Sequence, residues 1–204
     1  MDDLGNAPGP IVRTPFVAML RAVNVGGRNR VPMDQLRELA VDLGHSQVST
    51  YIQSGNLVFA GVPDDPAAVA AELEVALAAR FQVAVSVLVR TRDQMSDTVA
   101  SWPRSDDLGG SRHVTFLASE PDSKLVEALD PSRGLPDRFW IAGCDIYLSC
   151  TLGYGQTKLN NAFFERGLRV AATTRNWATV GRLLAMANAL EPASRRPPES
   201  DGTT

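Results

Sequence analysis

The hydrophobic residues of the first half of the chain follow strand and helix periods in turn. Residues 16–24 (FVAMLRAVN) form a short apolar run before Gly26-Gly27, a pattern typical of a buried strand followed by a loop. A helix is indicated next, with Pro32 in its first turn and Gly44 after its last apolar position. The patterns of this half predict a strand at 16–24, a helix at 32–43, strands at 48–53 and 57–60, a helix at 66–81 and a strand at 84–90.

The same order of elements returns in the second half, after a helix predicted near residues 92–101. The patterns there predict a strand at 112–118, a helix at 122–129, hairpin strands at 138–142 and 145–150, a helix at 158–167, a strand at 170–174 and a helix at 176–190. The letters of the two halves show no repeat, so the repetition is one of topology.

The order strand, helix, strand, strand, helix, strand is typical of the split-βαβ, or ferredoxin-like, unit. We therefore predict an α+β fold of two ferredoxin-like (βαββαβ) units with antiparallel sheets, plus a C-terminal helix. The expected organisation is a disordered tail at 1–14, a first unit at 15–91, a connecting helix and loop at 92–111, a second unit with its closing helix at 112–190, and a disordered tail at 191–204. A doubly wound parallel sheet is the alternative; it fits less well because two hairpins interrupt the alternation of strands and helices.

The composition is that of a globular protein, with 204 residues, 44% of them hydrophobic, and a net charge of -3. This acidic balance argues against a protein whose whole surface binds nucleic acid. The first residues lack the basic and apolar regions of a signal peptide, and no apolar run approaches the ~20 residues of a membrane span. Cys144 and Cys150 have neither disulfide-framework nor metal-ligand spacing, which favours a reduced, cytoplasmic protein with no membrane partner.

Polar residues and glycines gather where the predicted topology brings loops together. In a split-βαβ unit the first two strands are parallel, so the loop after the first strand and the hairpin turn lie at one end of the sheet. In the first unit this end collects Arg21, Asn24, Gly26, Gly27, Arg28, Arg30, Gln53, Ser54 and Asn56. In the second unit the opposite end collects Lys158, Arg175 and Asn176.

Basic charge is concentrated in the two segments that hold these loops. Four basic and no acidic residues lie between Asp3 and Asp34, and five basic residues against one acidic residue lie between Asp145 and Glu191. Arginine side chains and the free N–H groups at the start of a helix attract anions. We therefore expect both groups of residues to bind a ligand, with a phosphate- or carboxylate-bearing small molecule as the partner. The sequence identifies no cofactor and no catalytic base.

Each group also has a structural interpretation. The Gly26-Gly27 loop suits a tight strand-to-helix connection, and Arg21, inside an apolar strand, suits an ion pair. Residues 53–56 make a good hairpin turn, and Asn176 is a good N-cap for the last helix. Whether the two groups meet depends on how the units pack, which topology alone leaves open.

Four runs of residues resemble a known family. They are LRAVNVGGRNRVPM (20–33), YIQSGNLVF (51–59), KLNNAFFERGL (158–168) and ATTRNWATV (172–180). In this order they resemble the bacterial family called domain of unknown function 1697, over essentially the whole folded region. The resemblance implies two ferredoxin-like units in a cytoplasmic bacterial protein, and it implies no reaction. This sequence has Ala22 where Gly is common in such proteins and Arg28 where Lys is common.

Several chemistries are disfavoured. His45 and His113 lack metal-ligand spacing and are expected at surface or turn positions, so no metal site is predicted. Cys144 and Cys150 are expected to be inert thiols. The third predicted strand lacks the aromatic pattern with which RNA-recognition domains stack bases.

Three functions stay open. The first is a protein that binds a small anion, and the second is a nucleic-acid-binding protein that uses one basic edge. The third is a structural protein that forms a homodimer through its sheet edges. The sequence does not decide whether the protein is an enzyme or what its oligomeric state is.

Overall fold

The computed structural model describes residues 13–27, 29–62, 65–103 and 109–190. The predicted tails fall outside these residues except for Arg13 and Thr14, where the first strand begins. The elements of the first half are β1 (Thr14–Leu20), α1 (Met33–Asp42), β2 (Ser46–Tyr51), β3 (Asn56–Gly61), α2 (Pro66–Phe81), β4 (Val87–Thr91) and α3 (Arg92–Ala100). Those of the second half are β5 (Ser111–Leu117), α4 (Ser123–Glu127), a 3-10 helix (Pro131–Gly134), β6 (Arg138–Ala142), β7 (Asp145–Cys150), a 3-10 helix (Tyr154–Gln156), α5 (Asn161–Leu168), β8 (Ala172–Asn176) and α6 (Trp177–Asn188).

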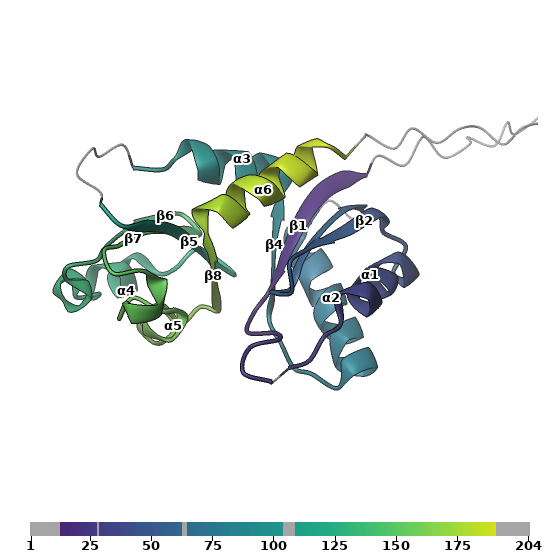
Figure 1. The fold of residues 1–204 in the computed structure, drawn as a ribbon, viewed down its shortest axis with the longest axis horizontal. Coiled ribbons are helices and arrows are strands. Elements are labelled where there is room, and N and C mark those ends of the chain that lie inside the picture. Colours follow the sequence, from purple (N-terminus) through teal and green to yellow (C-terminus); the bar gives the residue numbers. More distant parts are fainter. Residues whose placement is uncertain (1–12, 28, 63–64, 104–108, 191–204) are drawn as a thin grey trace, which may run out of the picture.

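The strands form two four-stranded antiparallel sheets with the same topology. Their orders are β2-β3-β1-β4 and β6-β7-β5-β8, and every neighbouring pair is antiparallel. This is the predicted α+β fold of two ferredoxin-like units, and it excludes the doubly wound parallel alternative. Figure 1 shows the two sheets side by side, with α1 and α2 packed beside the first and α4 and α5 beside the second.

Both faces of the first sheet are covered, which explains why the residues of β1 are almost all apolar instead of alternating with polar ones. Phe16, Ala18 and Leu20 alternate onto the face that packs with α1 and α2. Val17 and Met19 point to the opposite face, toward a second cluster. All five side chains are buried.

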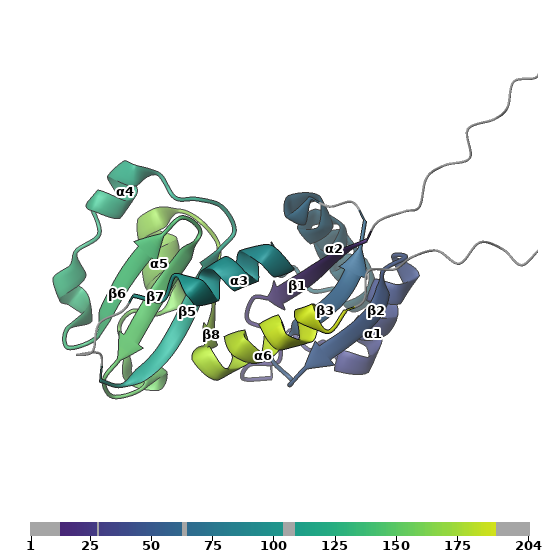
Figure 2. The ribbon, with the colours of Figure 1, turned by 90° about the horizontal axis from the view of Figure 1, so that it is seen from above.

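The second cluster joins the two halves of the molecule. It combines residues of the first sheet with Val114, Phe116 and Tyr147 of the second sheet and with apolar positions of α3 and α6. Helix α6 follows the last strand of the second unit yet contacts β1 and β3 of the first sheet as well as β5 and β8. Figure 2 shows α3 and α6 side by side across both sheets. The two units are therefore packed through a shared pair of helices.

Some boundaries and surroundings differ from the sequence prediction. Strand β1 ends at Leu20 instead of residue 24, because Ala22 and Asn24 take positive φ angles of 51° and 57° that break the extended backbone. His45 and His113, expected at surface or turn positions, are buried, with 4% and 9% of their surface exposed. Burial lowers the pKa of both histidines. None of the helices in the described part of the chain is long and apolar enough to cross a membrane.

Candidate functional site

Equivalent strands of the two units each carry a buried arginine at the same position. In the first sheet β1 pairs with β4 so that Val17 faces Arg90. In the second sheet β5 pairs with β8 so that Val114 faces Arg175. Each arginine is followed by a residue whose side chain caps a helix, Thr91 before α3 and Asn176 before α6. The local structure around the two arginines is thus repeated although the sequence is not.

Arg90 reaches from the first unit into the second. Its Nη2 group donates to the carbonyl oxygens of Leu117 (2.7 Å) and Cys144 (3.1 Å), and it lies 3.4 Å from Oδ1 of Asp145. Leu117 ends β5, Cys144 lies in the β6–β7 turn, and Asp145 begins β7. The guanidinium also lies 5.6 Å from the centre of the ring of Phe116.

Arg175 makes the reciprocal contacts from the second unit into the first. Its Nη2 group donates to the carbonyl oxygens of Leu20 (3.0 Å) and Ser54 (3.1 Å), and its Nε donates to Oδ1 of Asn56 (2.5 Å). Leu20 ends β1, Ser54 lies in the β2–β3 turn, and Asn56 begins β3. The two arginines therefore join the units in the manner of an isologous interface within one chain.

The two arginine contacts differ in charge. Arg90 faces the carboxylate of Asp145, whereas Arg175 faces the neutral amide of Asn56. Arg175 forms no ion pair with the described residues, and burial lowers its pKa to about 10. Burial also raises the pKa of Asp145, against the opposing effects of its hydrogen bond from Thr98 and of Arg90.

Of the second predicted group of site residues, Arg175 meets the first group across this junction. Arg21 forms a bidentate ion pair with Glu165 of α5, with Nε donating to Oε1 at 2.5 Å and Nη2 to Oε2 at 2.6 Å. This pair raises the pKa of Arg21. Arg175 contacts Ser54 and Asn56 as described above, and Asn176 uses its side chain to accept from the N–H of Thr179. These predicted residues thus have protein partners.

The loop after β1 lies beside the β2–β3 turn, as the topology predicts. Asn24 fixes it: its Nδ2 donates to the carbonyl oxygens of Val31 and Gln53, both at 2.9 Å, and its Oδ1 accepts from the N–H of Val31. Gly26 and Gly27 have φ angles of +59° and +75°. Of the predicted arginines here, Arg30 is exposed and Arg28 lies outside the described residues.

Lys158 lies in a small basic cavity instead of at the junction. The cavity has a volume of about 320 Å³ and is lined by Leu129, Arg133, Lys158, Asn160, Phe163, Arg166 and Gly167. No acidic side chain lines it. In the described part of the chain, Arg133, Lys158 and Arg166 form no ion pair.

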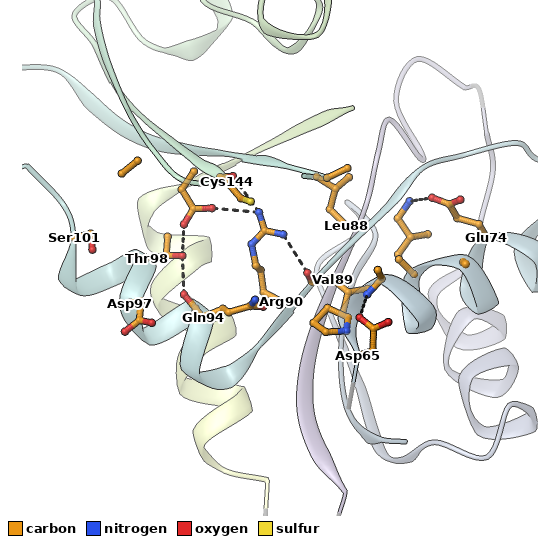
Figure 3. A pocket seen from close by; sticks show the side chains of 18 of the residues that line it. Asp65, Glu74, Leu88, Val89, Arg90, Gln94, Asp97, Thr98, Ser101 and Cys144 are labelled. Atoms are coloured by element: carbon orange, nitrogen blue, oxygen red, sulfur yellow. Dashed lines mark hydrogen bonds and ion pairs between the residues drawn. The ribbon is translucent and has the colours of Figure 1, made fainter. Parts of the chain in front are cut away.

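A larger cavity opens between the units beside Arg90, and sequence reasoning did not find it. Its volume is about 650 Å³, and its walls come from α2, β4 and α3 of the first unit and from the β6–β7 turn and the end of β5 in the second. Figure 3 shows Asp65 and Glu74 on one side, Asp97 and Ser101 on the other, and Arg90 between them. These residues all belong to the first unit and share no motif, and the cavity is completed only where Ala118, Cys144 and Asp145 of the second unit pack beside them.

The two cysteines both have thiols with a raised pKa. Cys144 borders the larger cavity, where burial raises the pKa of its thiol, and burial raises the pKa of Cys150 as well. No group of three or more histidine, cysteine, aspartate or glutamate side chains in the described ranges is arranged to hold a metal ion.

These features define a protein of two ferredoxin-like units joined by reciprocal arginine contacts. The chain belongs to the family described as "Protein of unknown function (DUF1697)", whose model matches residues 13–147. Its fold is similar to that of the conserved bacterial protein SP0830 from Streptococcus pneumoniae, with a TM-score of 0.64 and 22% sequence identity. That similarity covers 86% of this chain and 99% of the other and concerns the fold alone. No curated protein matches the chain.

Proposed function

We propose that this protein binds a small phosphate- or carboxylate-bearing molecule at the basic cavity of the second unit. The observation that carries the proposal is the set of three cationic side chains, Arg133, Lys158 and Arg166, which line one cavity without an acidic neighbour in its walls. Lys158 and Arg166 form no ion pair among the described residues and are free to donate charge-assisted hydrogen bonds to an anion, whereas Arg133 already interacts electrostatically with Asp130. The rest of the predicted set, including Arg30 and the Gly26-Gly27 loop, stays a prediction for the same class of ligand.

The charge around the cavity favours an anion over other ligands. Glu165, the acidic residue of α5, is already bound by Arg21 on another side of the helix. Its carboxylate therefore does not neutralise Lys158 or Arg166. The volume of about 320 Å³ suits a small molecule, which would enter from solvent because all three cationic residues are exposed.

The test is a binding screen of the purified protein against nucleotides, sugar phosphates and dicarboxylates at low salt, first by thermal shift and then by calorimetry. We expect a ligand whose affinity falls by about tenfold or more in the double variant Lys158→Ala/Arg166→Ala, because each lost charge-assisted hydrogen bond is worth about 1.5–3 kcal/mol. The matched control is Lys124→Ala, an exposed lysine of α4 outside the cavity. Equal loss in the control, or a ligand unaffected by the double variant, contradicts the proposal.

The same screen separates the other functions. Binding lost in Arg21→Ala and retained in Lys158→Ala/Arg166→Ala places the anion at the loop edge after β1. Binding of oligonucleotides with an affinity that falls steeply with salt supports the nucleic-acid alternative. A concentration-dependent dimer mass without any ligand supports the interaction alternative.

A further inference from the structure

The place of the larger cavity corresponds to a place on the other side of the junction that Arg21 occupies, and two glutamates mark the correspondence. In the first unit Glu74 of α2 accepts a hydrogen bond from the N–H of Val87, the first residue of β4, at 2.8 Å. In the second unit Glu165 of α5 accepts one from the N–H of Ala172, the first residue of β8, at 3.0 Å. Glu74 and Glu165 therefore occupy the same place in the two units.

Arg21 and Ala118 correspond in the same way. Each follows the last residue of the first strand of its unit. The N–H of Arg21 donates to the carbonyl oxygen of Ser86 at 2.9 Å, and the N–H of Ala118 donates to that of Ala171 at 3.0 Å. Ser86 and Ala171 directly precede β4 and β8. The backbone thus places position 118 relative to its sheet as it places position 21.

The two sides of the junction differ in what faces the glutamate. On one side the guanidinium of Arg21 crosses to Glu165 and binds both carboxylate oxygens. On the other side Ala118 has no side chain beyond Cβ, and Ala118 and Glu74 both line the cavity of about 650 Å³. Oε2 of Glu74 accepts no hydrogen bond in the described part of the chain. The protein supplies a guanidinium to one glutamate and leaves a cavity at the other.

The charge of the cavity suits a cation. Besides Glu74, its walls carry the carboxylates of Asp97, of Asp65, which caps α2, and of Asp145, which pairs with Arg90. The facing cation, Arg90, uses its guanidinium on acceptors of the protein itself. Figure 3 shows Asp65 and Glu74 on one side of Arg90 and Asp97 on the other. The walls also include apolar residues of β4 and alanines of α2, which offer contact surface for the carbon chain of a ligand.

We propose that the cavity between α2, α3 and the β6–β7 turn binds a small guanidinium-bearing ligand, whose guanidinium sits at Glu74 as that of Arg21 sits at Glu165. The guanidinium fork matches a carboxylate in bidentate geometry, which an ammonium group does not. The group can come from a free molecule or from an arginine of a short peptide. This proposal is independent of the anion site on the second unit.

The test is calorimetric titration of the full-length protein with agmatine, with the capped peptide acetyl-Ala-Arg-Ala-amide, and with 1,4-diaminobutane, which has no guanidinium. We expect one site for agmatine, the peptide or both, with 1,4-diaminobutane binding about tenfold more weakly or not at all. Which of the first two binds identifies the source of the group.

Two variants act on the cavity in different ways. Glu74→Gln keeps an oxygen for the N–H of Val87 but removes the charge, and we expect it to weaken agmatine binding about tenfold or more. Ala118→Arg introduces an arginine at the position equivalent to Arg21. We expect its guanidinium to occupy the cavity beside Glu74 and to abolish binding. Glu127→Gln, an exposed glutamate of α4 outside the cavity, is the matched control and should bind as the wild type does. Absence of binding in the wild type, or binding unchanged in both cavity variants, overturns the proposal.

Discussion

At the scale of single residues, Gly55 shows how closely the β2–β3 turn packs on the end of β1. Its φ is +71°, and a Cβ at this position would lie 2.8 Å from Cβ of Leu20 and closer still to the side chain of Val23. Both the backbone conformation and the space therefore require glycine here. The glycine of the predicted turn at residues 53–56 is therefore needed for the close contact between this turn and the residues that follow β1.

We expect Gly55→Ala to lower the free energy of unfolding by roughly 1–3 kcal/mol, through backbone strain and overpacking. The control is Gly181→Ala in α6, where a Cβ would meet open space and φ is not positive. That change should raise stability by roughly 0.5–1 kcal/mol, because alanine favours the helix. Urea denaturation of both variants measures the difference, and an unchanged Gly55→Ala protein would show that the turn is loosely packed.

His45 is the second informative residue because it is buried and neither ring nitrogen has a hydrogen-bond partner among the described residues. Burial, and then the charge of Arg13, lower its pKa below the ordinary value of 6.5, although a carboxylate oxygen of Glu72 lies 3.6 Å from Nε2. The folded protein therefore takes up a proton at this site less readily than the unfolded chain does. The contribution to stability is complete above about pH 6.5 and is lost as the pH falls through the lowered pKa.

We expect His45→Leu to flatten the fall in the free energy of unfolding below pH 6.5, because it removes a group that titrates differently in the two states. The measurement is urea denaturation at a series of pH values between about 4 and 8. His113, whose pKa is also lowered by burial, remains in the variant and accounts for part of the residual slope. An identical pH profile in variant and wild type would contradict this role for His45.

At the scale of elements, β4 and β8 perform the same task with different neighbours. Each ends in an arginine that enters the other unit and in a residue that caps the following helix. The pattern of apolar residues predicted the strands and helices well, since it depends on local periodicity. It could not show that Arg90 and Arg175 are partners of the opposite unit, because their acceptors are mostly backbone carbonyl groups far away in the sequence.

Because the contacts with Leu20, Asn56 and Leu117 are buried and those with Ser54 and Cys144 are partly buried, the loss of these hydrogen bonds should be costly. We expect Arg175→Ala to lower the free energy of unfolding by roughly 3 kcal/mol or more, since it leaves Leu20, Ser54 and Asn56 without a donor. Arg90→Ala should have an effect of similar size. Arg182→Ala, an exposed arginine of α6, is the control and should change stability by at most about 0.5 kcal/mol. Equal, small effects in all three variants in urea denaturation would argue against a structural role of the buried pair.

At the scale of the whole molecule, the two units form an approximate internal dimer whose two sides are not equivalent. The fold class and the joining of loop and turn followed from the sequence, because topology determines which ends of a sheet meet. The ion pair of Arg21 was one of two interpretations, but its partner Glu165 could not be assigned before the packing of the units was known. Glu74, Ala118 and Asp97 belong to no sequence motif. Their proposed role depends on a cavity that exists because Ala118 stands where the first unit has Arg21, and this equivalence is visible only in the structure.

The central claim is that the guanidinium of Arg21 occupies at Glu165 the place that corresponds to the open cavity at Glu74. Calorimetric titration of Arg21→Ala with agmatine tests it most directly, because this variant should open a second cavity at Glu165. We expect two binding sites per chain in Arg21→Ala, one in the wild type and, in the double variant Arg21→Ala/Ala118→Arg, one again. A single site in Arg21→Ala with the affinity of the wild type would contradict the correspondence between the two sides.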